Sequence, residues 1–136
     1  MKAHPPAMIA AIVPTIAVVD DDEAVRAALA NLLDSLGLGV VAFASAEAFL
    51  ASTAPSSVAC LIADMQMPGI SGLELHRHLV TIGRAVPVIL VTAFPREHVR
   101  LQAQEQGAIG YFAKPFEARA LIECLEKALH TKVSGA

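Results

Sequence analysis

The stretch of sequence that decides the fold is residues 15–23, which read TIAVVDDDE. Its first five residues are apolar or β-branched, as in a strand that is buried on both faces of a sheet. Three carboxylates follow at once, at Asp20, Asp21 and Asp22. Ligands of open α/β sheets bind beyond the carboxyl ends of the strands, so these carboxylates mark one edge of a candidate site.

Apolar runs of strand length alternate with amphipathic segments of helix length along the rest of the chain. The pattern predicts strands at residues 15–19, 40–43, 58–63, 86–91 and 108–112. It predicts helices at residues 23–36, 46–51, 71–82, 95–106 and 116–130. Asp22 and Ser45 are the expected N-caps of the first two helices, and Ser71 and Glu74 form a capping box at the third. Strict alternation predicts one α/β domain, with a parallel sheet covered by helices on both faces.

Length, composition and charge exclude several classes of protein. A chain of 136 residues has room for one domain, and a hydrophobic content of 55% excludes a disordered chain. The net charge of −3 and the lack of a basic block argue against nucleic-acid binding by this domain. The longest apolar run, residues 7–19, is too short to span a membrane, so we expect a cytoplasmic protein. We divide the chain into a flexible extension at 1–14, a domain at 15–130 and a tail at 131–136.

Polar side chains follow four of the five predicted strands. The acidic run 20–22 follows the first strand, Asp64 the third, Thr92 the fourth and Lys114 the fifth. Alone, each has an ordinary explanation: an Asp as a helix N-cap, a Thr as a core hydroxyl, a Lys as a solvated charge. Three adjacent carboxylates repel one another, however, and a hard divalent cation such as Mg²⁺ relieves that repulsion. Together at one edge of a sheet, these groups predict a phosphoryl site.

Four motifs carry a resemblance to a known family. They are VVDDDEAVR at 18–26, LIADMQMPGISGLEL at 61–75, VTAF at 91–94 and GYFAKPF at 110–116. In this order the chain resembles the receiver domain of bacterial two-component response regulators over most of its length. The second and fourth motifs are most similar to the subfamily whose fuller members add a helix-turn-helix DNA-binding domain. The resemblance implies a flavodoxin-like, doubly wound five-stranded sheet of strand order 2-1-3-4-5, which periodicity alone does not give.

The resemblance also implies the chemistry of the site. Asp64 matches the aspartate that accepts a phosphoryl group, from a sensor histidine kinase or a phosphotransfer protein. Asp20 and Asp21 match the acidic pair that binds Mg²⁺ or Mn²⁺ together with Asp64, and the backbone carbonyl of Gln66 supplies a further ligand. The family is not a class of enzymes in the usual sense, since its members catalyse only their own phosphorylation and dephosphorylation.

Three further positions match the family's signalling residues. Thr92 matches the switch hydroxyl, Lys114 the lysine that pairs with the phosphoryl group, and Tyr111 the switch aromatic. The resemblance also suggests a cis peptide bond between Lys114 and Pro115. It implies an output through the fourth helix, fifth strand and fifth helix, which contact a protein partner or a second copy of the chain.

One alternative function and one open question remain beside this hypothesis. Asp20-x-Asp22 after a buried strand imitates the nucleophile motif of haloacid-dehalogenase phosphatases, which also form an aspartyl phosphate. That family needs a larger chain and a later acidic motif, and it gives no reason for Asp64 and the MPG sequence that follows it. A second question is whether the chain acts alone or is the receiver of a longer regulator, and we slightly favour a stand-alone protein.

Overall fold

Five parallel strands lie side by side in the order β2-β1-β3-β4-β5, which confirms the flavodoxin-like order that the resemblance implies. The computed structural model describes residues 13–84 and 86–130; most of the predicted extension at 1–14 and all of the tail at 131–136 lie outside the described residues. The strands are β1 (Thr15–Val19), β2 (Gly39–Phe43), β3 (Cys60–Asp64), β4 (Val88–Thr92) and β5 (Gly110–Ala113). The helices are α2 (Glu23–Ser35), α3 (Ala46–Ala51), α4 (Gly72–Thr81), α5 (Glu97–Gln106) and α6 (Ala118–Leu129), with a short 3₁₀ helix, η1 (Ala54–Ser56).

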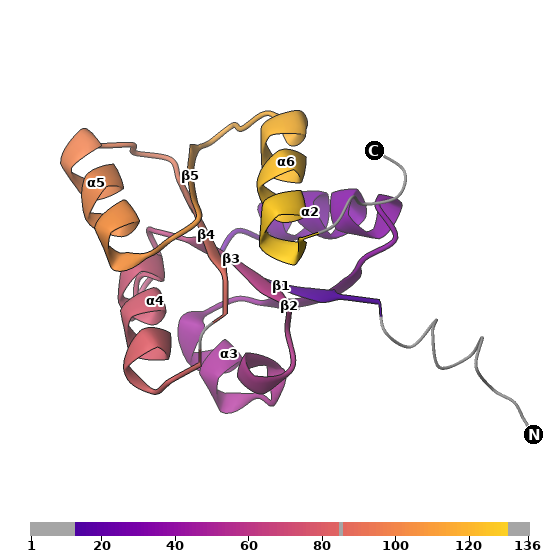
Figure 1. Cartoon of the computed structure of the whole chain (residues 1–136), viewed down its shortest axis with the longest axis horizontal. Coiled ribbons are helices and arrows are strands. Elements are labelled where there is room, and N and C mark those ends of the chain that lie inside the picture. The colour runs from indigo at the N-terminus through magenta and orange to yellow at the C-terminus, as the bar shows by residue number, and fades with distance from the viewer. Residues whose placement is uncertain (1–12, 85, 131–136) are drawn as a thin grey trace, which may run out of the picture.

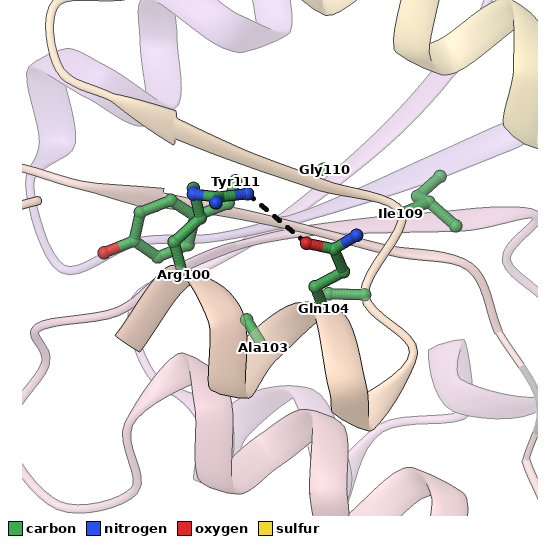
Figure 2. Close-up of a pocket in the computed structure, with 7 residues that line it drawn as sticks. Arg100, Ala103, Gln104, Ile109, Gly110 and Tyr111 are labelled. Atoms are coloured by element: carbon green, nitrogen blue, oxygen red, sulfur yellow. Dashed lines mark hydrogen bonds between the residues drawn. The ribbon is translucent and has the colours of Figure 1, made fainter. Parts of the chain in front are cut away.

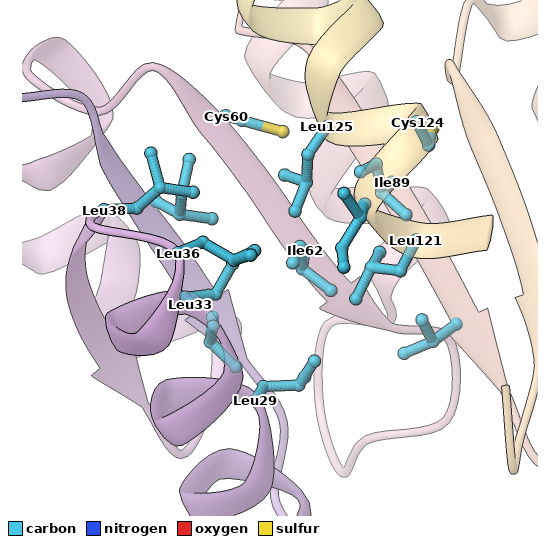
Figure 3. Packing of buried hydrophobic residues seen from close by; sticks show 14 residues of the cluster. Leu29, Leu33, Leu36, Leu38, Cys60, Ile62, Ile89, Leu121, Cys124 and Leu125 are labelled. Atoms are coloured by element: carbon cyan, nitrogen blue, oxygen red, sulfur yellow. The ribbon is translucent and has the colours of Figure 1, made fainter. Parts of the chain in front are cut away.

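The sheet separates two hydrophobic cores. Helices α2 and α6 cover one face of the sheet, and α3, α4 and α5 cover the other (Figure 1). In β1, Ile16 and Val18 pack into the core beneath α2 and α6, whereas Ala17 and Val19 pack into the opposite core. Figure 3 shows the first of these cores, which is lined by leucines of both covering helices. These four residues are fully buried, on both faces of the sheet, and the run at 15–19 therefore shows no alternation of apolar and polar residues.

The third, fourth and fifth strands each begin two residues later and end one residue later than predicted. Val58, Val86 and Ala108, which precede these strands, are partly buried against the core beneath α3, α4 and α5. Each apolar run therefore begins two residues before the hydrogen-bonded part of its strand. At the other end, Asp64 and Thr92 are the last residues of β3 and β4, so the sheet itself fixes the backbone of both.

The predicted helix caps are confirmed. The Asp22 carboxylate accepts two backbone N–H groups at the start of α2, and Ser45 accepts one at the start of α3. The capping box at Ser71 is complete in both directions. The helix η1 was missed because three residues are too few to show a hydrophobic period. In the described part of the chain, no helix has both the length and the apolar character needed to cross a membrane.

Two predicted helix starts are wrong by two residues. The helix predicted at 95–106 begins at Glu97, and the helix predicted at 116–130 spans Ala118–Leu129. Their N-caps, Arg96 and Glu117, have extended backbone. Neither residue makes a side-chain capping hydrogen bond, so the sequence has no Ser, Thr, Asp or Asn cap to mark either helix start.

Candidate functional site

Three carboxylates gather at the carboxyl ends of β1 and β3. Asp20 and Asp21 directly follow β1, and Asp64 ends β3. One oxygen of each carboxylate lies within 4.8 Å of the other two. Asp20 and Asp64 are only 1% and 4% exposed, whereas Asp21 is exposed. Three of the four acidic residues singled out in the sequence, Asp20, Asp21 and Asp64, therefore form one cluster, which reaches solvent at Asp21.

The backbone around Asp20 is held by three hydrogen bonds. The Asp22 N–H donates to the Asp20 carboxylate at 2.9 Å, and the Asp20 N–H donates to the Phe43 carbonyl at 3.1 Å. The Arg26 guanidinium donates to the Asp20 carbonyl at 2.6 Å. Sequence reasoning missed Arg26, although the residue lies in the first motif, because helical spacing does not show that its side chain returns to β1. Asp22 itself is a helix cap, and its carboxylate is thereby turned to its own helix.

Lys114 joins the two buried carboxylates. Its Nζ donates to Asp20 Oδ2 at 2.9 Å and lies 3.4 Å from Asp64 Oδ2. The peptide bond from Lys114 to Pro115 is cis, as the resemblance suggested. Burial lowers the pKa of the ammonium, but the contacts with Asp20 and Asp64 outweigh burial and raise that pKa above its ordinary value. Lys114 is therefore a permanent cation at the site.

The ionisation of Asp64 is set by its surroundings. Burial raises the pKa of this carboxyl to about 6, against the opposing effect of the Gln66 N–H, which donates to Asp64 Oδ1 at 3.2 Å. The neighbouring Asp20 charge raises the pKa further, and Lys114 lowers it. At neutral pH the carboxylate form still predominates. Three carboxyl groups thus meet one ammonium, with the Arg26 guanidinium at the Asp20 carbonyl, an arrangement whose oxygen atoms suit a hard divalent cation.

Thr92 lies on the strand next to Asp64 and is fully buried. Its hydroxyl oxygen accepts the Phe94 N–H at 3.0 Å, and its hydroxyl hydrogen goes to Gln66 Oε1 at 2.8 Å. Sequence reasoning assigned a role to the Gln66 carbonyl and missed the contact of its side chain. That contact joins the loops after two different strands, so no spacing within the sequence indicates it.

Tyr111 lies on β5, the edge strand beside β4. Its ring is partly buried against the core beneath α3, α4 and α5, and its hydroxyl accepts the Arg96 N–H at 3.4 Å. The ring lines a cavity of about 310 Å³, whose walls also include Gln66 and Phe94. Thr92 hydrogen-bonds to both of these wall residues, so Gln66 and Phe94 connect the two predicted switch residues, Thr92 and Tyr111.

A second cavity lies between α5 and β5 and shares Tyr111 as a wall. Its volume is about 300 Å³, and Figure 2 shows Arg100 and Gln104 of α5 facing Ile109, Gly110 and Tyr111 across it. Arg100 donates to Gln104 Oε1 at 3.3 Å. One ring thus borders both the cavity next to the phosphoryl site and the cavity between α5 and β5.

The loop between β3 and α4 is fixed near its end. The Ile70 N–H donates to the Glu47 carboxylate of α3 at 3.2 Å. A Cβ on Gly72 would lie 2.5 Å from the Asp64 carbonyl oxygen, so only glycine allows the first turn of α4 to pack this closely against β3. The first turn of α4 therefore packs directly against the backbone of Asp64.

Comparison with known proteins gives a consistent set of relatives. A model of the response regulator receiver domain matches residues 16–126. The response regulator protein TmoT of Ectopseudomonas mendocina is 40% identical over 114 residues, or 84% of this chain and 52% of that protein. The transcriptional regulatory protein FixJ of Azorhizobium caulinodans is 41% identical over 112 residues, or 82% of this chain and 53% of that protein.

The structural comparison agrees. The solved structure of the response regulator StyR is 42% identical, with a TM-score of 0.80, and the match covers 87% of this chain and 60% of that chain. The chain spans about half the length of the curated relatives it matches. Nothing in these matches supports the haloacid-dehalogenase alternative.

Proposed function

This chain belongs to the response regulator receiver domain family, and from that premise we propose that it accepts a phosphoryl group on Asp64. The donor is a phosphohistidine of a sensor histidine kinase or of a phosphotransfer protein. The observation that carries the proposal is the meeting of three carboxylates within 4.8 Å, with the Lys114 ammonium between Asp20 and Asp64. The names of the relatives, a response regulator and a transcriptional regulatory protein, support a regulatory role.

The transfer exchanges one bond to phosphorus for another. A carboxylate oxygen of Asp64 forms the new P–O bond while the P–N bond to the donor imidazole breaks, and the bonding electron pair goes to the imidazole nitrogen. The obstacle is repulsion between an anionic nucleophile and an anionic phosphoryl group. Lys114 lies 3.4 Å from Asp64 Oδ2, where it offsets charge on the incoming oxygens. The rigid ends of β3 and β4 supply the positioning.

The acidic cluster fits Mg²⁺. Magnesium prefers oxygen ligands in an octahedron with bonds of about 2.1 Å, so opposite ligands lie about 4 Å apart. The three carboxylate oxygens lie within 4.8 Å of one another, so small movements would bring them to that geometry. Asp20, Asp21 and Asp64 would hold the ion with the Gln66 carbonyl, and Mn²⁺ would accept the same oxygens. The bound ion would neutralise the phosphoryl oxygens as they approach Asp64.

Asp21 is expected to contribute more to Mg²⁺ binding than its neighbour Asp22. Asp21 belongs to the three-carboxylate cluster, whereas the Asp22 carboxylate is occupied by two N–H groups of α2. Asp21→Ala should weaken Mg²⁺ binding by on the order of tenfold or more, and Asp22→Ala by no more than about twofold. Isothermal titration of Mg²⁺ into both variants checks this. A larger loss of Mg²⁺ binding in Asp22→Ala than in Asp21→Ala would shift the metal-binding acidic pair by one residue along the chain.

We assign the docking of the phosphate donor to a groove beside Lys114. The groove has a volume of about 500 Å³, and apolar side chains of α2 and of the segment after β5 line it, including Val25, Leu29, Leu32 and Phe116. Lys114 and Pro115 also line it, and the Lys114 ammonium lies 3.4 Å from Asp64 Oδ2, so a helix lying in the groove would bring its histidine toward Asp64. Apolar surface next to a charged reaction site suits a partner that must bind and then leave.

We further propose that phosphorylation changes the face formed by α5, β5 and α6, which we call the output face. The phosphoryl oxygens attract the Thr92 hydroxyl, and its movement releases Gln66 and Phe94, two wall residues of the 310 Å³ cavity that the Tyr111 ring can then enter. Inward movement of the ring would change the cavity between α5 and β5 (Figure 2). The reshaped output face then binds a protein partner or a second copy of the chain, because its affinity differs between the two states.

Thr92→Ala tests this coupling. The variant keeps Asp64, Lys114 and the acidic cluster, so phosphoryl incorporation should largely persist. The change in oligomeric state or partner affinity that follows phosphorylation should be reduced several-fold, because the hydroxyl that links the two sites is gone. Light scattering before and after phosphorylation measures the change. An equal response in wild type and variant would contradict the proposed switch.

The direct test of the proposed function is phosphorylation by acetyl phosphate. In the presence of Mg²⁺, intact-mass spectrometry should show the addition of one phosphoryl group, which a chelator prevents. Peptide mapping after borohydride trapping should place the group on Asp64. Addition without metal, or at a different residue, would overturn the assignment.

A further inference from the structure

The Thr92 hydroxyl is already fully engaged in the structure. Its oxygen accepts the Phe94 N–H at 3.0 Å, and its single hydrogen is donated to Gln66 Oε1 at 2.8 Å. A hydroxyl has one hydrogen to give, so Thr92 cannot donate to Gln66 and to a phosphoryl oxygen at the same time. Binding of a phosphoryl group therefore competes with a bond that already exists.

Gln66 contacts both the proposed phosphoryl acceptor, Asp64, and the proposed switch hydroxyl, Thr92. Its backbone N–H donates to Asp64 Oδ1 at 3.2 Å, and its side chain accepts from Thr92. The residue lies in the loop after β3, whereas Thr92 ends β4, so the side-chain contact bridges two strands. The residue itself is exposed, although the hydroxyl that it binds is fully buried. Its amide can therefore move into solvent, while the buried hydroxyl takes a phosphoryl oxygen as its new acceptor.

We propose that the Gln66 side chain is a positioning residue that holds the Thr92 hydroxyl in its resting orientation. The inference rests on the proposed function, because it concerns the step in which Thr92 turns to the phosphoryl group. The bond to Gln66 stabilises the resting state alone, and each phosphorylation event must break it. Gln66 thus lowers the affinity of the site for a phosphoryl group and keeps the unphosphorylated protein in its resting state.

A simpler role for Gln66 predicts a different result. If the side chain only screens the site or touches the phosphoryl group directly, its removal changes affinity whether or not Thr92 has a hydroxyl. If it acts by holding the hydroxyl, its removal has an effect only when the hydroxyl is present. The two roles are therefore separated by combining substitutions at both positions.

The experiment measures the affinity for beryllofluoride, a phosphoryl mimic, by titration calorimetry in excess Mg²⁺ and fluoride. Gln66→Leu, which removes the acceptor from an exposed position, should bind beryllofluoride about two- to tenfold more tightly than wild type, because one resting-state hydrogen bond is lost. Gln66→Ala should change the affinity in the same direction. The same substitution at Gln102, an exposed glutamine of α5, is the matched control and should leave the affinity unchanged.

Two backgrounds complete the design. In Thr92→Val, which lacks the hydroxyl, Gln66→Leu should have no effect on affinity. In Thr92→Ser, which keeps the hydroxyl, the tightening should return. Unchanged affinity of Gln66→Leu in the wild-type background, or an equal change in Thr92→Val, would overturn the role of Gln66 while leaving the proposed function intact. Failure of wild type to bind beryllofluoride, together with no labelling by acetyl phosphate, would overturn the proposed function and this inference with it.

Discussion

Asp64→Asn is expected to abolish phosphoryl incorporation from acetyl phosphate or from a phosphorylated kinase. An amide lacks the negative charge and the nucleophilic oxygen that the new P–O bond requires. No other carboxylate is equivalent, because Asp20 is held by Lys114 and the Asp22 N–H, and Asp21 is exposed. Intact-mass spectrometry should show a single unmodified species under conditions that fully label wild type.

Two measurements make this result specific. Asp22→Asn is the matched control, since asparagine also caps helices well and labelling should persist. The folding of Asp64→Asn is checked by denaturation of the metal-free protein at pH 7.5. Because burial raises the pKa of Asp64 to about 6, its ionised form opposes folding above that pH, and the variant should be more stable than wild type there. Labelling of Asp64→Asn at Asp22 would favour the phosphatase alternative.

Lys114→Met is expected to lower the stability of the metal-free protein by about 2 kcal/mol at pH 7.5. The substitution leaves Asp20 and Asp64, both buried, without their shared cation. The loss should shrink at pH 5, because Asp64 then takes up a proton and the repulsion between the carboxylates falls. Removal of Lys114 raises the folded-state pKa of Asp64 beyond about 6, so the added instability appears as the pH rises through that range.

Urea denaturation at pH 5 and pH 7.5, with a chelator present, measures this effect. Lys127→Met on α6 is the control for loss of a lysine, and it should change stability by less than about 0.5 kcal/mol. In an Asp64→Asn background, the cost of Lys114→Met should fall markedly, since one of the two charges is gone. An equal cost at both pH values, or in both backgrounds, would show that Lys114 stabilises the fold by packing rather than by charge.

The sequence predicts what depends on local pattern. The buried run before Asp20 and the caps at Asp22, Ser45 and Ser71 follow from side-chain type and spacing, and the structure confirms them. The strand order does not follow from periodicity, because any permutation of buried parallel strands has the same hydrophobic pattern. Resemblance to a family supplied that order, and the structure confirms it.

The rest of the site depends on contacts between residues distant in sequence. The Gln66 side chain meets Thr92 across 26 positions, and the Arg26 guanidinium returns to the Asp20 carbonyl from within α2. Neither contact leaves a periodic signal. The starts of α5 and α6 were misplaced for a different reason, since their N-caps, Arg96 and Glu117, make no side-chain capping hydrogen bond. Without a capping side chain, the local rules for helix ends have no residue that marks the start.

Tyr111 has an optical consequence. The chain contains one tyrosine and no tryptophan, so its near-ultraviolet emission arises from the phenol ring at the wall between the two cavities. The quantum yield and lifetime of that ring depend on its solvation and on whether its hydroxyl accepts the Arg96 N–H. The unlabelled, unmutated protein therefore carries its own spectroscopic probe at the switch position. Time-resolved emission during phosphorylation would test, without an attached dye, whether the ring changes orientation as proposed.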